Sequence, residues 1–358
     1  MKHIMLTLMA ALMLVACGSK NQYTLNVQLS DDQVGTMVYL YDIVSQQPLD
    51  SLRAESTTVA FCGEVATPFA AMVRTQGYYG ICFIEPGTIE LNPVVDALSG
   101  TPLNEKYAAA MFAGDVLEAQ TIFNEKLPEY NALDPEAQRT MLPLMDSLYN
   151  NLMAASKQAF LALFENNLDN VLGAYAFSQL ADTYQSAQEM EQALSKASDM
   201  VKNYPPVKER LEQLRVLDAT AVGKLFVDFE GTDYATGETT SLAKLIEGKL
   251  ALVDVWASWC GPCRQEIRDN MVRLHKQYAP KGLFVLGIDV NDKPEAHKKA
   301  TEELGIAYHQ LIDNKGVCCN LYGINGIPHI MLIGPDGTIL ARDLRGDAIE
   351  EAILQHLQ

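Results

Sequence analysis

The sequence has few basic residues for its length, with 27 lysines and arginines against 45 aspartates and glutamates and a formal net charge of -18. Proteins that bind nucleic acid present a basic face to the phosphates, so this balance argues against nucleic acid as a partner. It also argues against electrostatic attachment to anionic lipid. Charged residues make up 20% and hydrophobic residues 48% of the 358 residues, which is typical of a globular protein and not of a disordered chain.

The apolar run at the N-terminus, residues 4–16, is too short to span a bilayer as a mature helix. Its length, with Lys2 before it, suits the hydrophobic region of a secretory signal. The tetrapeptide LVAC at residues 14–17 resembles the lipobox of bacterial lipoproteins. That resemblance implies that residues 1–17 are a signal peptide and that Cys17 becomes lipidated. The alternatives are an ordinary signal peptide with a chance cysteine, or a buried first helix.

Seven cysteines are present, and six remain when Cys17 is set aside. An even remainder is compatible with disulfides in an oxidising compartment, although the connectivity cannot be deduced from sequence. The six are Cys62, Cys82, Cys260, Cys263, Cys318 and Cys319. Cys62 and Cys82 are either bridged across strands or two buried thiols, because free cysteine is itself among the most buried residue types.

Residues 18–100 carry short runs rich in β-branched and aromatic residues, punctuated by Gly, Pro, Asp and Ser, which predict a small antiparallel sheet or sandwich. Residues 101–219 place apolar residues three and four apart and predict a helical segment with a linker. Pro128, Pro135 and Pro143 are expected to break this helical run, and Pro205-Pro206 marks a further junction.

Residues 220–358 alternate between strand and helix patterns. Strands are expected at 249–258, 282–290, 327–334 and 337–346, the last two joined as a hairpin. Helices are expected at 263–278, 294–305 and 348–357. Strands that alternate with helices predict an α/β domain with a central, partly parallel sheet and helices on both faces.

The stretch VDVWASWCGPCRQE, residues 253–266, holds Cys260 and Cys263 two residues apart, after a strand and at the start of a helix. Unpaired N–H groups and the helix dipole favour a thiolate at Cys260, which makes it the attacking sulfur. Pro262 suits the first turn, and Cys263 is placed to resolve a mixed disulfide. A structural bridge or half of a zinc site are the alternatives. Zinc needs a second such pair or two histidines at ligand spacing, and none is present, so we expect no metal.

LVDVWASWCGPCR, followed downstream by GIPHIMLIGPDGTIL, resembles the thioredoxin-fold, TlpA/ResA-type thiol-disulfide oxidoreductases, which are membrane-tethered. The upstream β and helical parts resemble, in arrangement only, the N-terminal extension of some such lipoproteins. The resemblance implies that Pro328 is a cis-proline beside the cysteine pair and that the backbone of Ile327 pairs with an extended substrate. Trp259, Gly261 and Pro262 would border the same substrate site.

Asp254 lies in an otherwise apolar strand six residues before Cys260. An acid there would be buried with a raised pKa, and it would exchange a proton with Cys263, a role that the matching family position carries. The alternative is an acid at a strand end that reaches water. Asp292 is the nearest equivalent of an acid that borders the active site in this family.

His329, directly after Pro328, either modulates the thiolate or is an exposed histidine without a role; we favour the second interpretation. The adjacent pair Cys318 and Cys319 departs from the family pattern. A disulfide between them would be strained and easily reduced. The pair is therefore expected to be two thiols of a short helix, one inward and one outward, with a soft-metal site or a second redox relay as the alternative.

Together these patterns predict a membrane-anchored, extracytoplasmic thiol-disulfide oxidoreductase without a cofactor, lipid-anchored and facing the periplasm. Gly-Pro between the cysteines favours a reductant. Its partners would be client proteins with disulfides or thiols and a membrane electron-donor protein. One alternative is a thiol peroxidase, but VWASWC lacks the Pro and Thr expected of that chemistry. Another is a client- or ligand-binding lipoprotein with an accessory redox domain.

Overall fold

The computed structural model describes residues 21–357, so the predicted signal peptide and Cys17 lie outside the described residues. The chain forms two compact units. The N-terminal unit runs up to Tyr184 and includes Gln192–Glu209, and the C-terminal unit combines Gln185–Glu191 with the chain from Arg210 onward. The four-part division expected from the sequence stays a prediction.

Two four-stranded sheets make up the β part of the N-terminal unit. The first has the order β4-β1-β7-β8 and the second β3-β2-β5-β6. The predicted antiparallel β structure is confirmed, except that β1 and β7 pair in parallel. Alternation explains the strands: in β4, for example, Val59 and Phe61 are buried while their neighbours face outward. The strand bounds are β1 (Gln22–Gln28), β2 (Met37–Asp42), β3 (Pro48–Arg53), β4 (Thr58–Glu64), β5 (Phe69–Arg74), β6 (Tyr79–Ile84), β7 (Gly87–Asn92) and β8 (Ala97–Ser99).

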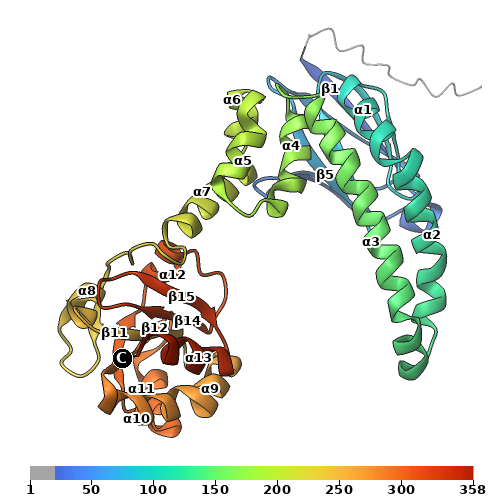
Figure 1. The fold of residues 1–358 in the computed structure, drawn as a ribbon. Coiled ribbons are helices and arrows are strands. Elements are labelled where there is room, and N and C mark those ends of the chain that lie inside the picture. The colour runs from blue at the N-terminus through green and yellow to red at the C-terminus, as the bar shows by residue number, and fades with distance from the viewer. Residues whose placement is uncertain (1–20, 358) are drawn as a thin grey trace, which may run out of the picture. The chain divides into compact units, whose positions relative to one another are not determined.

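The helices that follow are α1 (Pro102–Met111), α2 (Gly114–Asn131), α3 (Pro135–Glu165), α4 (Val171–Leu180), α5 (Ala187–Ala193), α6 (Asp199–Lys202) and α7 (Pro205–Ala219). Figure 1 shows α2 and α3 side by side as a helical hairpin. Asn104 fixes α1 on β6, because its amide group donates to the carbonyl of Phe83 and accepts from the N–H of the same residue at 2.7 and 2.8 Å.

The expected breaks at the prolines are only partly correct. Pro135 begins α3, where Asp134 caps the N-terminus, and Pro205 begins α7. Pro128 and Pro143, however, lie inside α2 and α3. A proline removes one backbone donor from a helix, and a long helix that is packed along its length tolerates that loss. The two interior prolines therefore do not interrupt the helical hairpin.

The C-terminal unit is built on a seven-stranded sheet with the order β10-β9-β13-β12-β11-β14-β15. β12 pairs in parallel with β11 and β13, and the other ladders are antiparallel. Its strands are β9 (Glu230–Asp233), β10 (Thr239–Ser241), β11 (Leu250–Trp256), β12 (Leu283–Val290), β13 (His309–Asp313), β14 (His329–Ile333) and β15 (Ile339–Leu344). The predicted mixed sheet with its terminal hairpin is confirmed, while β9, β10 and β13 were not foreseen.

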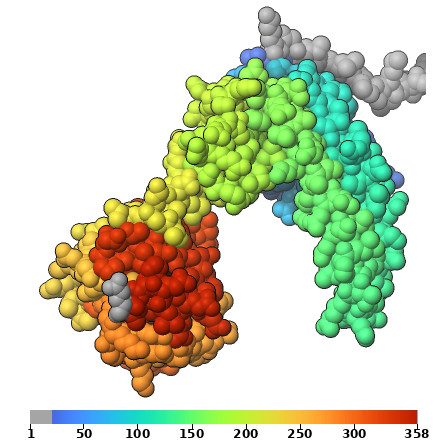
Figure 2. Space-filling model, in the orientation of Figure 1, coloured from blue at the N-terminus to red at the C-terminus, as the bar shows by residue number. Residues whose placement is uncertain are grey.

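Helices cover both faces of this sheet, as predicted. One apolar cluster packs α9, α10, α11 and α13 on one face, and the other packs α8 and α12 on the opposite face. The helices are α8 (Leu242–Ile246), α9 (Gly261–Glu266), α10 (Val272–Tyr278), α11 (Pro294–Leu304), α12 (Val317–Tyr322) and α13 (Asp347–His356). A π-helical turn, Ile267–Met271, joins α9 to α10. The orange to red part of this unit packs as one rounded body (Figure 2).

Candidate active site

The central strand β11 leads directly into the cysteine pair. All seven of its residues are buried, as expected for an interior strand covered on both faces. Cys260 is the N-cap of α9, and the N–H of Cys263 points at its Sγ atom from 3.1 Å. Pro262 lies in the first turn of the helix. The sulfur of Cys260 thus faces the unpaired N–H groups of a helix start, where a thiolate is stabilised.

Cys260 and Cys263 are joined by a disulfide, and the two sulfurs differ in their access to solvent. Cys263 is fully buried, whereas Cys260 retains 5% of its surface and borders a groove of about 530 Å³. The groove is also lined by Trp259, Gly261, Pro262, Asn291, Cys319 and Ile327. The bond between Ile327 and Pro328 is cis, as the family resemblance implied. A partner molecule in this groove meets Cys260 first.

Asp254 is buried, 1% exposed, on the strand before the cysteine pair. Alternation along β11 places it on the same face as Leu252 and Trp256, which pack in one cluster with Cys263. Burial raises the pKa of Asp254 to about 8, Glu266 adds to the rise, and Arg345 opposes it. Within residues 21–357 neither carboxyl oxygen has a hydrogen-bond partner. The predicted burial and raised pKa are thus present, and the proton-exchange role stays a prediction.

Asp292 contacts the turn that carries the cysteine pair. Its carboxylate accepts hydrogen bonds from the N–H of Ser258 at 2.6 Å and from the hydroxyl of the same residue at 2.9 Å. Burial opposes ionisation, but these hydrogen bonds outweigh it, so the pKa of Asp292 is lowered. Asp292 thus contacts Ser258 from the loop after β12, and its expected role at the border of the active site stays a prediction.

The prediction that His329 is exposed is wrong. It begins β14, which lies between β11 and β15 and has all five residues buried. Burial and the neighbouring Arg342 guanidinium lower the pKa of His329 to about 4. Its Nδ1 atom lies 3.5 Å from an oxygen of Asp343. A strand was expected over residues 327–334, but the sequence does not show that strands pair on both sides of it and that its first side chain is therefore buried.

The other four cysteines within residues 21–357 are free thiols. Cys318 is buried and Cys319 half-buried on α12, which confirms the expected short helix with one thiol inward and one outward. Cys62 is exposed on β4 and Cys82 is buried on β6 of the other sheet. These two are therefore not bridged, and only Cys82 matches the alternative of a buried thiol.

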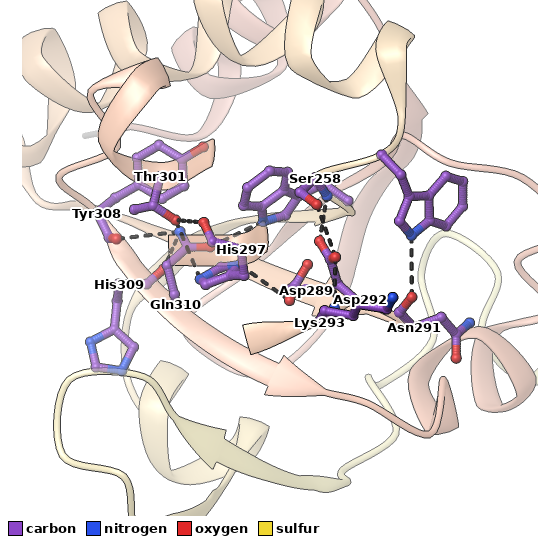
Figure 3. A network of polar contacts seen from close by, with 12 residues as sticks. Ser258, Asp289, Asn291, Asp292, Lys293, His297, Thr301, Tyr308, His309 and Gln310 are labelled. Carbon is purple, nitrogen blue, oxygen red and sulfur yellow. Dashed lines mark hydrogen bonds and ion pairs between the residues drawn. The ribbon is translucent and has the colours of Figure 1, made fainter. Parts of the chain in front are cut away.

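A second set of polar residues near the site was missed from the sequence (Figure 3). Asp289 of β12 and His297 of α11 are each 1% exposed, with Oδ2 and Nδ1 3.1 Å apart. Next to them, the indole N–H of Trp256 donates to the side-chain oxygen of Gln310 at 3.0 Å. The signal that was available is Asp289 itself, an acid in the apolar run GLFVLGIDV.

No cluster of three or more histidine, cysteine or acidic side chains that would hold a metal occurs among residues 21–357. In the same stretch, no helix is long and apolar enough to cross a membrane.

Comparison with known proteins finds thiol-disulfide oxidoreductases among the relatives of this chain. Residues 222–342 match the AhpC/TSA family. ResA, a thiol-disulfide oxidoreductase of Bacillus thuringiensis, is 27% identical over 137 residues, which cover 38% of this chain and 77% of the relative. HelX, a thiol:disulfide interchange protein of Rhodobacter capsulatus, is 32% identical over 116 residues, 32% of this chain and 62% of the relative.

The C-terminal domain of this chain belongs to the thioredoxin-fold thiol-disulfide oxidoreductases. A solved thioredoxin domain of a thiol-disulfide oxidoreductase from Bacteroides vulgatus is 30% identical, covers 38% of this chain and 99% of that chain, and superposes with a TM-score of 0.36. In this oxidoreductase domain of the TlpA/ResA type, Cys260 and Cys263 form the CxxC pair.

Proposed function

We propose that this oxidoreductase is extracytoplasmic and membrane-anchored, and that it reduces disulfides of client proteins. The observation that carries the proposal is the unequal placement of the two sulfurs. Cys260 faces the groove at the start of α9, while Cys263 is fully buried on the side of the sheet that holds Asp254. An attacking thiolate needs access, and a resolving thiol needs only to reach the first sulfur.

Each turnover moves two electrons from the dithiol to the client. The Cys260 thiolate attacks one client sulfur, forming a mixed disulfide and releasing the other client sulfur as a thiolate. The Cys263 thiol gives up its proton and attacks Cys260, which breaks the mixed disulfide and releases the second client thiolate. The products are a client dithiol and the Cys260–Cys263 disulfide, which a membrane electron-donor protein must reduce again.

Asp254 is proposed as the group that takes the proton from Cys263. With a pKa raised to about 8, the carboxyl of Asp254 can both take up and release a proton near neutral pH, as a group that exchanges a proton must. The carboxyl can exchange this proton without competing hydrogen bonds, because in the described part of the chain its oxygens have no partner.

The groove is proposed as the client site. Trp259 is 62% exposed beside Cys260, and the carbonyl oxygen of Ile327 lies 3.6 Å from the Cys260 sulfur. An extended client segment would pair with the backbone of Ile327 as an added strand, which brings its own sulfur to Cys260. Gly261 and Pro262 border the same space.

Anchoring is proposed through Cys17, and rests on the lipobox-like residues 14–17 alone. Several acyl chains on one residue would hold the protein at a membrane facing the periplasm. Labelling with a radioactive fatty acid tests this directly. The label should enter the wild-type chain and be lost in Cys17→Ala, which should also leave the membrane fraction.

The catalytic proposal is tested with the reduced protein and a peptide that carries one disulfide. The wild-type chain should reduce the peptide with dithiothreitol as the electron source, and Cys260→Ser should lose this activity. Consumption of hydrogen peroxide at a higher rate than peptide reduction would instead identify a thiol peroxidase.

A further inference from the structure

The turn that carries Cys260 is held by the loop after β12. Asp292 accepts two hydrogen bonds from Ser258, and the indole N–H of Trp259 donates to the carbonyl oxygen of Asn291 at 3.2 Å. Asn291 has a φ of +52°, in the left-handed region that only a few residue types adopt readily. Residues 291 and 292 therefore fix the two residues that come immediately before Cys260.

The loop is in turn attached to the buried pair of Asp289 and His297 (Figure 3). These two side chains approach to 3.1 Å at 1% exposure, and Asp289 ends β12 three residues before Asp292. Burial raises the pKa of Asp289, His297 opposes the rise, and Asp292 adds to it. The buried pair thus lies next to the partly exposed carboxyl of Asp292, and the proton of one group depends on the charges of the others.

Two aromatic rings pack against His297. Its ring lies 4.7 Å from the ring of Tyr234 and 5.4 Å from that of Trp256, measured between centroids. The Nε2 atom lies 3.4 Å from the hydroxyl of Thr301. The ring is therefore fixed in position, and water is kept from the carboxyl of Asp289.

One further ion pair faces the same turn, from α9 and α11. The guanidinium of Arg264 lies 3.5 Å from the carbonyl oxygen of Ser258 and pairs with Glu303 at 2.8 Å. Both side chains are partly exposed, and the hydrogen bond from Arg264 holds the pKa of Glu303 below its usual value. The pH-dependent contribution at this turn is therefore assigned to the carboxyls of Asp289 and Asp292 beside His297, whereas Asp254 on β11 is the same in all variants compared and cancels from their ratio.

We propose that His297 is a positioning residue for thiol-disulfide exchange: through Asp289 and Asp292 it holds the Ser258–Cys260 turn and couples protonation of this cluster to reduction of the cysteine pair. The inference rests on the proposed redox role of Cys260 and Cys263. Reduction adds two electrons and two protons to the neutral disulfide, which gives two thiols, and release of the Cys260 proton then leaves one negative charge at that sulfur. By linkage, that charge favours the protonated form of the neighbouring cluster, and the equilibrium between disulfide and dithiol changes with pH accordingly.

The test is the exchange equilibrium between the Cys260–Cys263 disulfide and dithiothreitol, measured from pH 5.5 to 8.5 in the full chain. The background carries Cys318→Ser and Cys319→Ser so that only the CxxC pair exchanges. We expect the ratio of the equilibrium constants of wild type and His297→Gln to change across this range by about threefold or more, the effect of half a pKa unit. Asp289→Asn should show a similar change, and serves if His297→Gln does not fold.

His309→Gln is the matched control. His309 forms an imidazole–carboxylate pair with Asp233 at the same 3.1 Å, between β13 and β9, without a described contact to Ser258 or Asp292. The ratio of the exchange equilibrium constants of His309→Gln and the wild type should stay constant with pH. A constant ratio for His297→Gln and Asp289→Asn, or an equal change in His309→Gln, would overturn the inference. If the wild-type Cys260–Cys263 pair does not exchange with dithiothreitol at all, both the proposed function and this inference are overturned.

Discussion

The sulfur of Cys260 lies 3.6 Å from the carbonyl oxygen of Ile327, at the wall of the groove. Its disulfide partner Cys263 is fully buried against the core of the oxidoreductase domain. A client disulfide can therefore be attacked by one of the two sulfurs only, and the second sulfur acts from inside.

Replacement of Cys263 by serine should trap the client. The first attack by Cys260 proceeds without Cys263, but the mixed disulfide then has no buried thiol to resolve it. With a disulfide-bonded peptide, Cys263→Ser should accumulate a covalent adduct visible by mass spectrometry under non-reducing conditions, and Cys260→Ser should not. Equal adducts on both variants would contradict the assigned order of attack.

Replacement of Asp254 by asparagine should stabilise the oxidised protein at alkaline pH. The pKa of this carboxyl is about 8 in the folded protein, against an ordinary value near 4, so the folded state holds a proton that the unfolded chain releases. Its contribution to stability therefore falls as pH rises from about 4 to about 8. We expect Asp254→Asn to raise the free energy of unfolding at pH 8 by a few kcal/mol, at about 1.4 kcal/mol per pKa unit, and to change it little at pH 4.

Urea unfolding at both pH values checks this prediction. Asp292→Asn is a useful control, because the pKa of Asp292 is lowered and that variant should lose stability at neutral pH instead. An equal effect of Asp254→Asn at pH 4 and pH 8 would show that Asp254 is ionised in the folded protein.

His329 should make the domain sensitive to acid. Its pKa is about 4 in the folded protein, below the ordinary value of about 6.5, so the unfolded chain binds the proton more readily. Stability is therefore lost as pH falls from about 6.5 to about 4. In His329→Gln the part of this loss due to His329, on the order of 3 kcal/mol, should disappear. Thermal unfolding at pH 7 and pH 4.5 measures it, and an unchanged loss in the variant would place the acid sensitivity elsewhere.

The free cysteines should fall into two reactivity classes. Cys62 is exposed and Cys319 half-buried, and the pKa of Cys319 is lowered by its hydrogen bond with the thiol of Cys318. Burial raises the pKa of Cys82 to about 12, and Cys318 is also buried. Iodoacetamide should therefore alkylate Cys62 and Cys319 at least about tenfold faster than the other two in the folded, oxidised protein. Peptide mapping over time separates the four sites, and rapid labelling of Cys82 or Cys318 would contradict their burial.

The α/β architecture and the cysteine pair were predictable because they depend on local patterns. A buried strand, a CxxC and a proline in the first helical turn lie within residues 250–263, so their arrangement follows from the chain itself. The burial of Asp254 followed from an acid in an apolar run. Asp289 is also an acid in an apolar run, so its burial could have been predicted in the same way. Its partner His297 lies on the next helix, and the sequence alone does not indicate which face of α11 meets β12.

The predictions that His329 is exposed and that the interior prolines break the helices were wrong for a related reason. Whether a residue after a proline faces solvent depends on the strands that pair on both sides, here β11 and β15. The prolines at 128 and 143 interrupt hydrogen bonds locally, yet the packing of α2 against α3 keeps both helices continuous. Contacts between distant segments decided these cases, and local propensity did not.

The central claim, that this domain reduces its clients, is tested most directly by the equilibrium reduction potential of the Cys260–Cys263 pair. It is measured against glutathione and dithiothreitol buffers, in the Cys318→Ser, Cys319→Ser background. The account predicts a potential below about -230 mV, near that of thioredoxin. A value near -120 mV, as in strong oxidants, would contradict it and show that the protein makes disulfides in its clients.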